Sequence, residues 1–156
     1  MTPAVFFTKT DLWEVKQMSE LNFHFDVDGT DFTSAGNASV QVKKSLRQLG
    51  ISAETIRRVS IAMYEGEINM VIHAGGGTAD VFVYEDRIEI VLDDTGPGIP
   101  DIALAMQEGY STAPESVRSL GFGAGMGLPN MKRYTDKMDI ESQVGTGTKI
   151  TMVVNI

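Results

Sequence analysis

The chain has 156 residues, of which 42% are hydrophobic and 22% are charged, and it contains no cysteine. This length suits one compact domain with its own core, and the absence of cysteine excludes a disulfide framework and a thiolate metal site. The formal net charge is −8 and no run of Lys or Arg offsets it, which excludes nucleic acid as a first choice of partner. The sequence offers neither a signal peptide nor a membrane-length apolar run, which fits a reducing cytoplasm.

Residues 1–20 are predicted to be an N-terminal extension of a single domain. Thr10 and Asp11 can cap a short helix within it. From Leu21 to Val27, apolar and polar residues alternate strictly, which predicts a half-buried strand. We therefore place the domain at residues 21–156.

Two amphipathic helices are predicted next. Asp31 is placed to cap the first, whose apolar residues recur at helical spacing over residues 32–49, and Gly50 is placed to end it. Ser52 is placed to cap the second, whose pattern continues to the glycines at 75–77. Each helix has one apolar face, so both are expected to pack on a sheet.

The rest of the chain consists of shorter elements. Residues 81–92 predict two antiparallel strands joined by a turn. The further elements predicted are a short helix at 101–108, an irregular polar segment at 109–120, a helix at 128–134, and strands at 138–144 and 149–156 around a glycine turn. This order predicts an α/β fold of the α+β type, a two-layer α/β sandwich with a mixed, mostly antiparallel sheet and helices on one face.

Glu65 and Asn69 lie four residues apart on the second predicted helix, so both side chains leave the same face. An amide oxygen is a suitable ligand for Mg²⁺, and a carboxylate one turn away can accept a proton from an attacking hydroxyl or water. The same pair can lie on a solvated helix face, so these two residues alone do not establish a ligand site. Glu67, two residues on, is predicted to point elsewhere, at the surface.

Asp94 ends a predicted strand and is followed by Gly96 and Gly98. Its carboxylate can accept a hydrogen bond from an exocyclic amine such as that of adenine, and the glycines allow a base or ribose to approach the backbone. An ordinary turn explains the same residues.

A glycine-rich segment from Gly121 to Gly127 precedes a predicted helix. Such a segment offers backbone amides and a positive helix end to an anion, for which a triphosphate is the obvious candidate. It is not a Walker loop, because no Lys-Ser or Lys-Thr follows the last glycine. A flexible hinge is the structural alternative.

Taken together and in this order, the three patterns resemble the N, G1 and G2 boxes of the GHKL ATPase superfamily, and Gly145 to Thr148 looks like its last motif. The resemblance covers nearly everything after residue 20. It implies a Bergerat-type fold that binds ATP or ADP with Mg²⁺, with Glu65 as the base, Asn69 as the metal ligand, Asp94 as the adenine reader assisted by Thr148, and residues 109–120 as a lid. The nucleotide-binding residues that it implies are Asn69, Asp94, Gly96, Gly98, Ile99, Ser111, Thr112, Gly121, Gly123, Ala124, Gly125, Met126, Gly127, Leu128 and Thr148.

Within that superfamily, the chain is most similar to the small serine/threonine kinases of bacterial partner-switching modules, the anti-sigma-factor kinases. Three stretches carry this similarity: residues 94–102, 108–112 and 123–132. It implies a kinase that phosphorylates a Ser or Thr of an anti-sigma-factor antagonist-type protein, and a homodimer.

Other functions stay open. The chain can instead be an anti-sigma factor that sequesters a sigma factor under the control of the bound nucleotide. It can also be an ATPase in which Glu65 activates water, although such ATPases need further domains to use the hydrolysis and we expect none in this chain. His73 is expected to contact a helix C-terminus. Arg118 and Lys132 can contact phosphate, but solvated surface positions explain these two residues at least as well.

Overall fold

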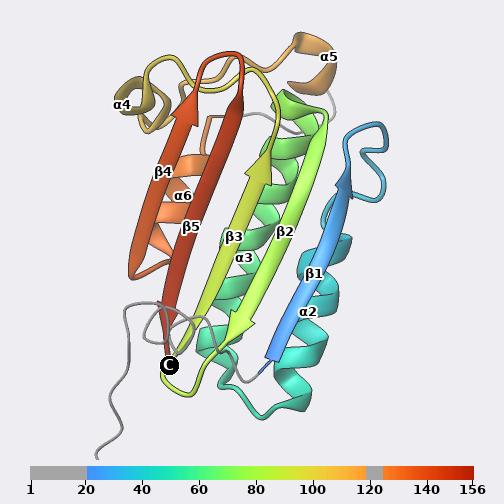
Figure 1. Ribbon diagram of the computed structural model, residues 1–156, viewed down its shortest axis with the longest axis vertical. Helices are drawn as coiled ribbons and strands as arrows, with labels where there is room; N and C mark the ends of the chain where they lie inside the picture. Colours follow the sequence, from blue (N-terminus) through green and yellow to red (C-terminus); the bar gives the residue numbers. More distant parts are fainter. Residues whose placement is uncertain (1–20, 119–124) are drawn as a thin grey trace, which may run out of the picture.

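The computed structural model describes residues 21–118 and 125–156 (Figure 1). The strands are β1 (Leu21–Asp28), β2 (Gly76–Val83), β3 (Arg87–Asp94), β4 (Lys137–Gln143) and β5 (Gly147–Asn155). The helices are α2 (Asn37–Gln48), α3 (Ala53–Asn69) with its π-helical continuation η1 (Met70–Ala74), α4 (Ile102–Ala105), α5 (Glu115–Arg118) and α6 (Gly127–Arg133). The helix predicted after Thr10 lies outside the described residues, and no helix in the described part of the chain has the length and apolarity that a bilayer crossing requires.

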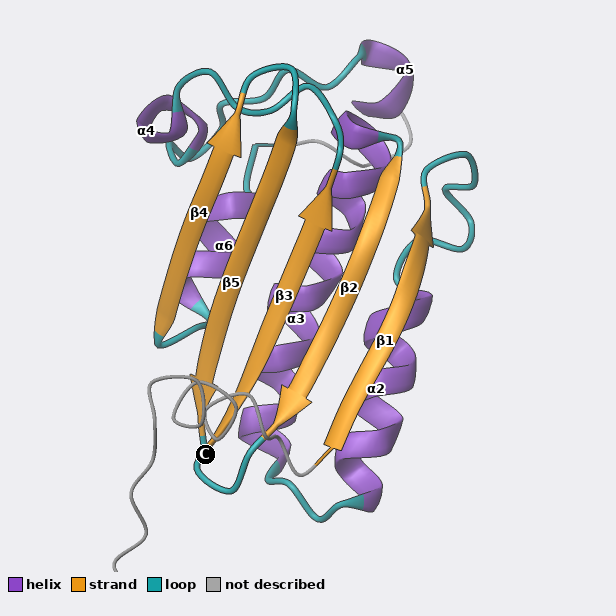
Figure 2. Cartoon of the chain, in the orientation of Figure 1, coloured by secondary structure: helices purple, strands orange, loops and turns teal. Residues whose placement is uncertain are grey.

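The strands form one sheet in the order β1-β2-β3-β5-β4, and each of these neighbouring pairs is antiparallel. Helices α2, α3 and α6 all lie on the same face of this sheet (Figure 2). The predicted two-layer sandwich is therefore confirmed. Because β3 pairs directly with β5, Asp94 lies opposite Thr148. Residues 95–136 leave the sheet between β3 and the edge strand β4.

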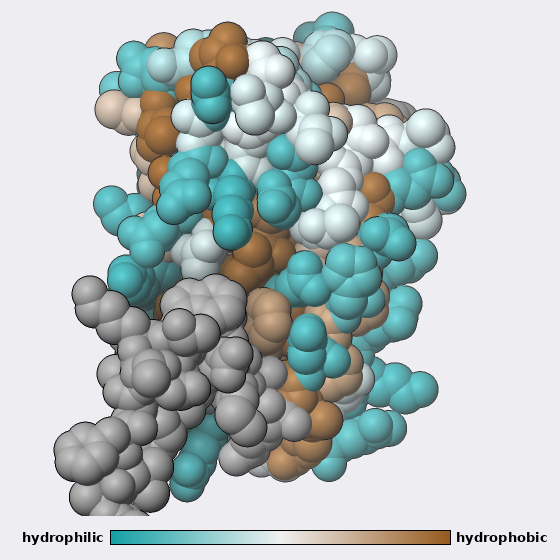
Figure 3. All heavy atoms as spheres, in the orientation of Figure 1, coloured by the Kyte–Doolittle hydropathy of each residue, from teal (hydrophilic) through white to brown (hydrophobic). Residues whose placement is uncertain are grey.

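The core lies between the sheet and the helices, as the strand alternation predicts. Its fully buried side chains come from the inner faces of both layers: Val42, Leu46, Val59, Met63, Val81, Ile88, Ile90, Met131, Met152 and Val154. The opposite face of the sheet carries the polar half of each strand, and Figure 3 shows mainly hydrophilic side chains on it around a smaller apolar area. His24 lies on this polar side, with Nδ1 2.7 Å from Asp80 Oδ1.

The first helix begins at Asn37, so the prediction that Asp31 caps a helix starting at Phe32 is wrong. Asp31 Oδ1 instead accepts hydrogen bonds from the backbone N (2.9 Å) and Oγ1 (2.6 Å) of Thr33, which closes a local turn. Gly36 then has a φ of 96°, a left-handed conformation through which an α-helix cannot run. The predicted end of the helix is confirmed, because α2 ends at Gln48 and Gly50, with a φ of 76°, follows the capping residue Leu49.

The prediction that Glu67 lies at the surface is also wrong, because this residue is only 2% exposed. Its carboxylate accepts hydrogen bonds from the backbone N of Gly36 (2.9 Å), Ala38 (3.3 Å) and Ser39 (2.7 Å). These amides belong to the start of α2, where Gly36 offers no side-chain cap. A carboxylate from α3 therefore caps α2 and ties the two helices together. Burial raises the pKa of Glu67 above its usual value, and the backbone donors oppose this effect.

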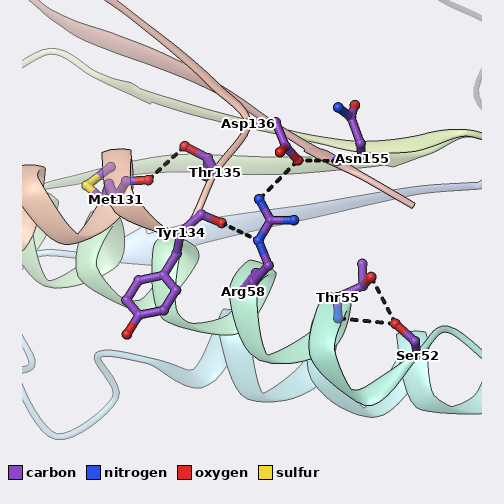
Figure 4. Close-up of polar contacts among 8 residues, drawn as sticks. All are labelled: Ser52, Thr55, Arg58, Met131, Tyr134, Thr135, Asp136 and Asn155. Atoms are coloured by element: carbon purple, nitrogen blue, oxygen red, sulfur yellow. Dashed lines mark hydrogen bonds and ion pairs between the residues drawn. The ribbon is translucent and has the colours of Figure 1, made fainter.

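The second helix begins as predicted, with Ser52 Oγ accepting a hydrogen bond from Thr55 N at 3.2 Å (Figure 4). The α-helical part ends at Asn69, however, and the chain continues through the π-helical turn η1. A π turn adds a residue to the helical ring, so the side chains that follow it are rotated relative to an uninterrupted α-helix. Gly75, with a φ of 72°, ends this turn.

The C-terminal end of α6 is fastened to α3 and to the sheet (Figure 4). Arg58 Nε donates to the carbonyl oxygen of Tyr134 at 3.2 Å, and its Nη2 lies 3.0 Å from Asp136 Oδ2. The same carboxylate accepts from the backbone N of Asn155 at 2.7 Å. One arginine thus fixes the position of α6 relative to α3.

Candidate functional site

A cavity of about 490 Å³ lies where α3, the ends of β3 and β5, and the start of α6 meet. Its volume falls within the range of small-molecule sites. It brings together most of the site residues predicted from the sequence: Glu65, Asn69, Asp94, Gly98, Ile99, Ser111, Thr112, Gly125, Met126, Gly127, Leu128 and Thr148. Gly96 is not among the residues that line the cavity, and Gly121, Gly123 and Ala124 lie outside the described residues.

Glu65 and Asn69 both line the cavity from α3, so the face that they share is turned to this space and is not simply a solvated surface. The start of α6 passes close to them. A Cβ built on Gly127 would lie 3.0 Å from the side-chain amide of Asn69. Glycine at this position therefore allows the backbone of α6 to approach Asn69.

Asp94 is held by backbone donors on one side of its carboxylate. Its Oδ1 accepts hydrogen bonds from Gly96 N at 3.0 Å and from Thr148 N at 3.2 Å. Within the described residues no donor reaches Oδ2, so this oxygen can accept a hydrogen bond from a ligand in the cavity. Gly96 thus contributes by orienting Asp94 from behind, although it does not line the cavity itself.

Ser142 is part of this network, and the sequence analysis missed it. Its Oγ lies 2.8 Å from Thr148 Oγ1 and accepts a hydrogen bond from Ile99 N at 2.7 Å. It is the β4 residue paired with Thr148 across the hairpin. The register of the two predicted strands around the glycine turn was the signal that could have identified it.

The cavity also has an apolar wall that the sequence analysis did not assign. Leu92 and Ile150 line it from neighbouring strands, and Met70 lines it from η1. The inward alternation of the strands places Leu92 and Ile150 on the same face as Asp94 and Thr148. An apolar wall next to one free carboxylate oxygen suits a flat ring that carries a single amine donor.

The predicted lid, residues 109–120, is described up to residue 118 and contains the short helix α5. Gly109 N donates to Gly125 O at 2.9 Å, and a Cβ on Gly125 would lie 2.4 Å from the Gly109 carbonyl carbon. The lid and the glycine-rich segment therefore touch through their backbones. Arg118 donates to Ser111 O at 2.8 Å, and Lys132 is exposed and does not line the cavity.

His73 lines the cavity from η1, and burial lowers its pKa, whereas the hydrogen bond and the charge of Asp80 raise the pKa of His24. We expect the two histidines to titrate on opposite sides of pH 6.5, the usual value for this residue. His24 then adds stability below pH 6.5 that is lost as the pH rises through its raised pKa, and His73 adds stability above pH 6.5 that is lost as the pH falls through its lowered pKa.

The ring resonances of the two histidines in NMR spectra, followed against pH and assigned with His73→Gln, check this prediction. Two coincident titrations would contradict the burial of His73 beside the cavity.

The sequence matches the histidine kinase-like ATPase domain family over residues 31–154. It is 33% identical over 111 residues to the serine/threonine-protein kinase RsbT of Bacillus subtilis, which covers 69% of this chain and 77% of that protein. It is 34% identical over 121 residues to the anti-sigma F factor of Clostridium novyi, which covers 74% of this chain and 81% of that protein.

Two solved structures show the same arrangement of helices and strands. The RsbU and RsbW domains of Rv1364c from Mycobacterium tuberculosis superpose with a TM-score of 0.59 at 15% identity, over 86% of this chain and 32% of that longer one. The SiaB-SiaC complex from Pseudomonas aeruginosa gives a TM-score of 0.57 at 11% identity, over 94% of this chain and 95% of that chain. At these identities the likeness concerns the fold alone.

Proposed function

Because this chain belongs to the histidine kinase-like ATPase domain family, which implies ATP binding, we propose that it is an ATP-dependent serine/threonine protein kinase of a partner-switching module. Its substrate is then a Ser or Thr hydroxyl of an anti-sigma-factor antagonist-type protein. The observation that carries the proposal is the meeting of Glu65, Asn69 and Asp94 in one cavity. A protein relative named as a serine/threonine kinase supports the choice of reaction.

The cavity offers separate groups for the two ends of ATP. The free oxygen of Asp94 suits the exocyclic amine of adenine, and Leu92 and Ile150 suit the faces of the ring. The backbone of Gly125 to Gly127 borders the same cavity near Asn69, where a phosphate chain would lie. The glycines lack the side chains that would keep a phosphate away from their amides.

Asn69 is the residue that we assign to Mg²⁺. Among the described residues, no three His, Cys, Asp or Glu side chains gather where they could hold a metal ion, so the protein alone does not form a complete metal site. This fits a magnesium ion that takes one amide oxygen from the protein and its other ligands from phosphate and water. Bound there, the ion would neutralise charge on the phosphates during transfer.

Glu65 is the residue that we assign to proton removal. In the proposed reaction, the hydroxyl oxygen of the protein substrate forms a bond to the γ-phosphorus, and the bond from that phosphorus to the bridging oxygen of ADP breaks. The hydroxyl proton passes to the Glu65 carboxylate, so the products are a phosphorylated Ser or Thr and ADP. The protein contributes chiefly by holding the reactants in line.

Asp94→Asn is expected to weaken ATP binding by about ten- to hundredfold, because the amide places a donor where the adenine amine also donates. Asp93→Asn is the matched control, since Asp93 is the preceding residue and lies on the opposite side of β3. Calorimetric titration of both variants with ATP and Mg²⁺ measures the effect. Equal affinities for the two variants would contradict the role of Asp94.

The proposed function itself is tested by transfer of γ-labelled phosphate from ATP to candidate antagonist proteins. Label on a Ser or Thr of one such protein supports the kinase. If the chain instead captures a sigma factor, if this capture depends on ADP or ATP, and if no label is transferred, the result would favour the sequestering function. The name of the Clostridium novyi relative suggests that function. Rapid ATP hydrolysis without any partner would favour the ATPase.

A further inference from the structure

Helices α3 and α6 run antiparallel and contact one another at several levels. Near the C-terminal end of α3, Gly127 passes over the amide of Asn69, with 3.0 Å from an ideal Cβ to the nearest amide atoms. Toward the start of α3, Arg58 donates to Tyr134 O at 3.2 Å (Figure 4). Contacts on both sides therefore fix the register of the two helices.

Between these two contacts, Asn130 Nδ2 lies 3.2 Å from Glu65 Oε1. An ionised carboxylate only accepts hydrogen bonds, so the side chain of Asn130 must present its NH₂ group and not its oxygen. Within the described residues, this is the one hydrogen bond that the carboxylate of Glu65 makes. It engages Oε1, and no donor of residues 21–118 or 125–156 reaches Oε2.

We propose that Asn130 is a positioning residue for Glu65. It holds the carboxylate by Oε1, so that Oε2 is presented as the oxygen that takes the substrate proton. This inference rests on the proposed kinase function. The physical reason is that the last torsion of a glutamate side chain is broad and selects no single orientation by itself. A donor on a helix whose register is fixed on both sides restricts that rotation, and catalysis depends steeply on such placement.

Asn130→Ala is expected to lower kcat for phosphoryl transfer to the protein substrate by about ten- to hundredfold and to leave the KM for ATP unchanged. Asn130→Asp, which has the same shape, is expected to lower kcat at least as much, because it faces Glu65 with a like charge. In a Glu65→Gln background, Asn130→Ala should cause no further loss, since the two residues act as one unit. Lys132→Ala is the matched control on the same helix, at an exposed position outside the cavity.

A second measurement tests the contact without depending on kinase activity. The side-chain NH₂ resonances of Asn130 in the NMR spectrum should shift between the wild-type protein and Glu65→Ala, which removes the acceptor, and they should not shift in Lys132→Ala. Unchanged resonances in Glu65→Ala would overturn the inference, whether or not the chain transfers phosphate. A full kcat in a folded Asn130→Ala protein, or an equal loss in the Glu65→Gln background, would overturn it while the proposed function stands.

Discussion

Glu65→Gln is expected to lower the rate of phosphoryl transfer to the protein substrate by about 10²–10⁴-fold and to leave the affinity for ATP nearly unchanged. Glutamine has the size of glutamate, and its oxygen can still accept the hydrogen bond from Asn130, so the cavity should keep its shape. An amide cannot take the hydroxyl proton at neutral pH. The loss should therefore appear in kcat, with the nucleotide still bound.

Single-turnover transfer of labelled phosphate measures this rate, and calorimetry measures the affinity for ATP. Glu54→Gln is the control, because Glu54 lies on the same helix but in its exposed first turn. Transfer by Glu65→Gln at the wild-type rate would show that Glu65 is not the base. A large loss of ATP affinity would show that its main role is to bind the nucleotide.

Glu67→Ala is expected to lower the free energy of unfolding by about 3 kcal/mol or more, the largest stability effect that we predict. The substitution leaves three backbone N–H groups at the start of α2 without their acceptor. It also leaves a cavity where a side chain with 2% exposure was packed. Glu67→Gln retains an acceptor oxygen and should lose less.

Urea unfolding measures both variants, with Glu85→Ala as the control at an exposed turn position. The raised pKa of Glu67 adds a pH signature. In the folded protein Glu67 binds the proton more tightly than in the unfolded chain. Its contribution to the free energy of unfolding is therefore full below pH 4.5 and diminishes as the pH rises through the raised pKa. Glu67→Gln should lack this dependence of stability on pH. Equal stability of Glu67→Ala and Glu85→Ala would contradict the capping role.

Local sequence patterns determined where many of the helices and strands of this protein begin and end. The alternation from Leu21 to Val27, the stop at Gly50 and the cap at Ser52 each depend on residues close together in the chain, and the structure has all three. The four-residue spacing of Glu65 and Asn69 likewise placed both on one helix face. Such features could be predicted because helix and strand periods and caps are local properties.

Tertiary structure decided the rest. In the sequence, Glu67 looks like an ordinary polar helix residue. It is buried because its carboxylate contacts Gly36, which lies 31 residues away in the chain. Asn130 and Ser142 join the site through contacts 65 and 43 residues away, with Glu65 and Ile99 respectively. No local preference encodes such a pair. The packing of α6 on α3 selects the first pair, and the path of the chain after β3 selects the second. A polar group that is partly withdrawn from water takes the partner that the fold brings within reach.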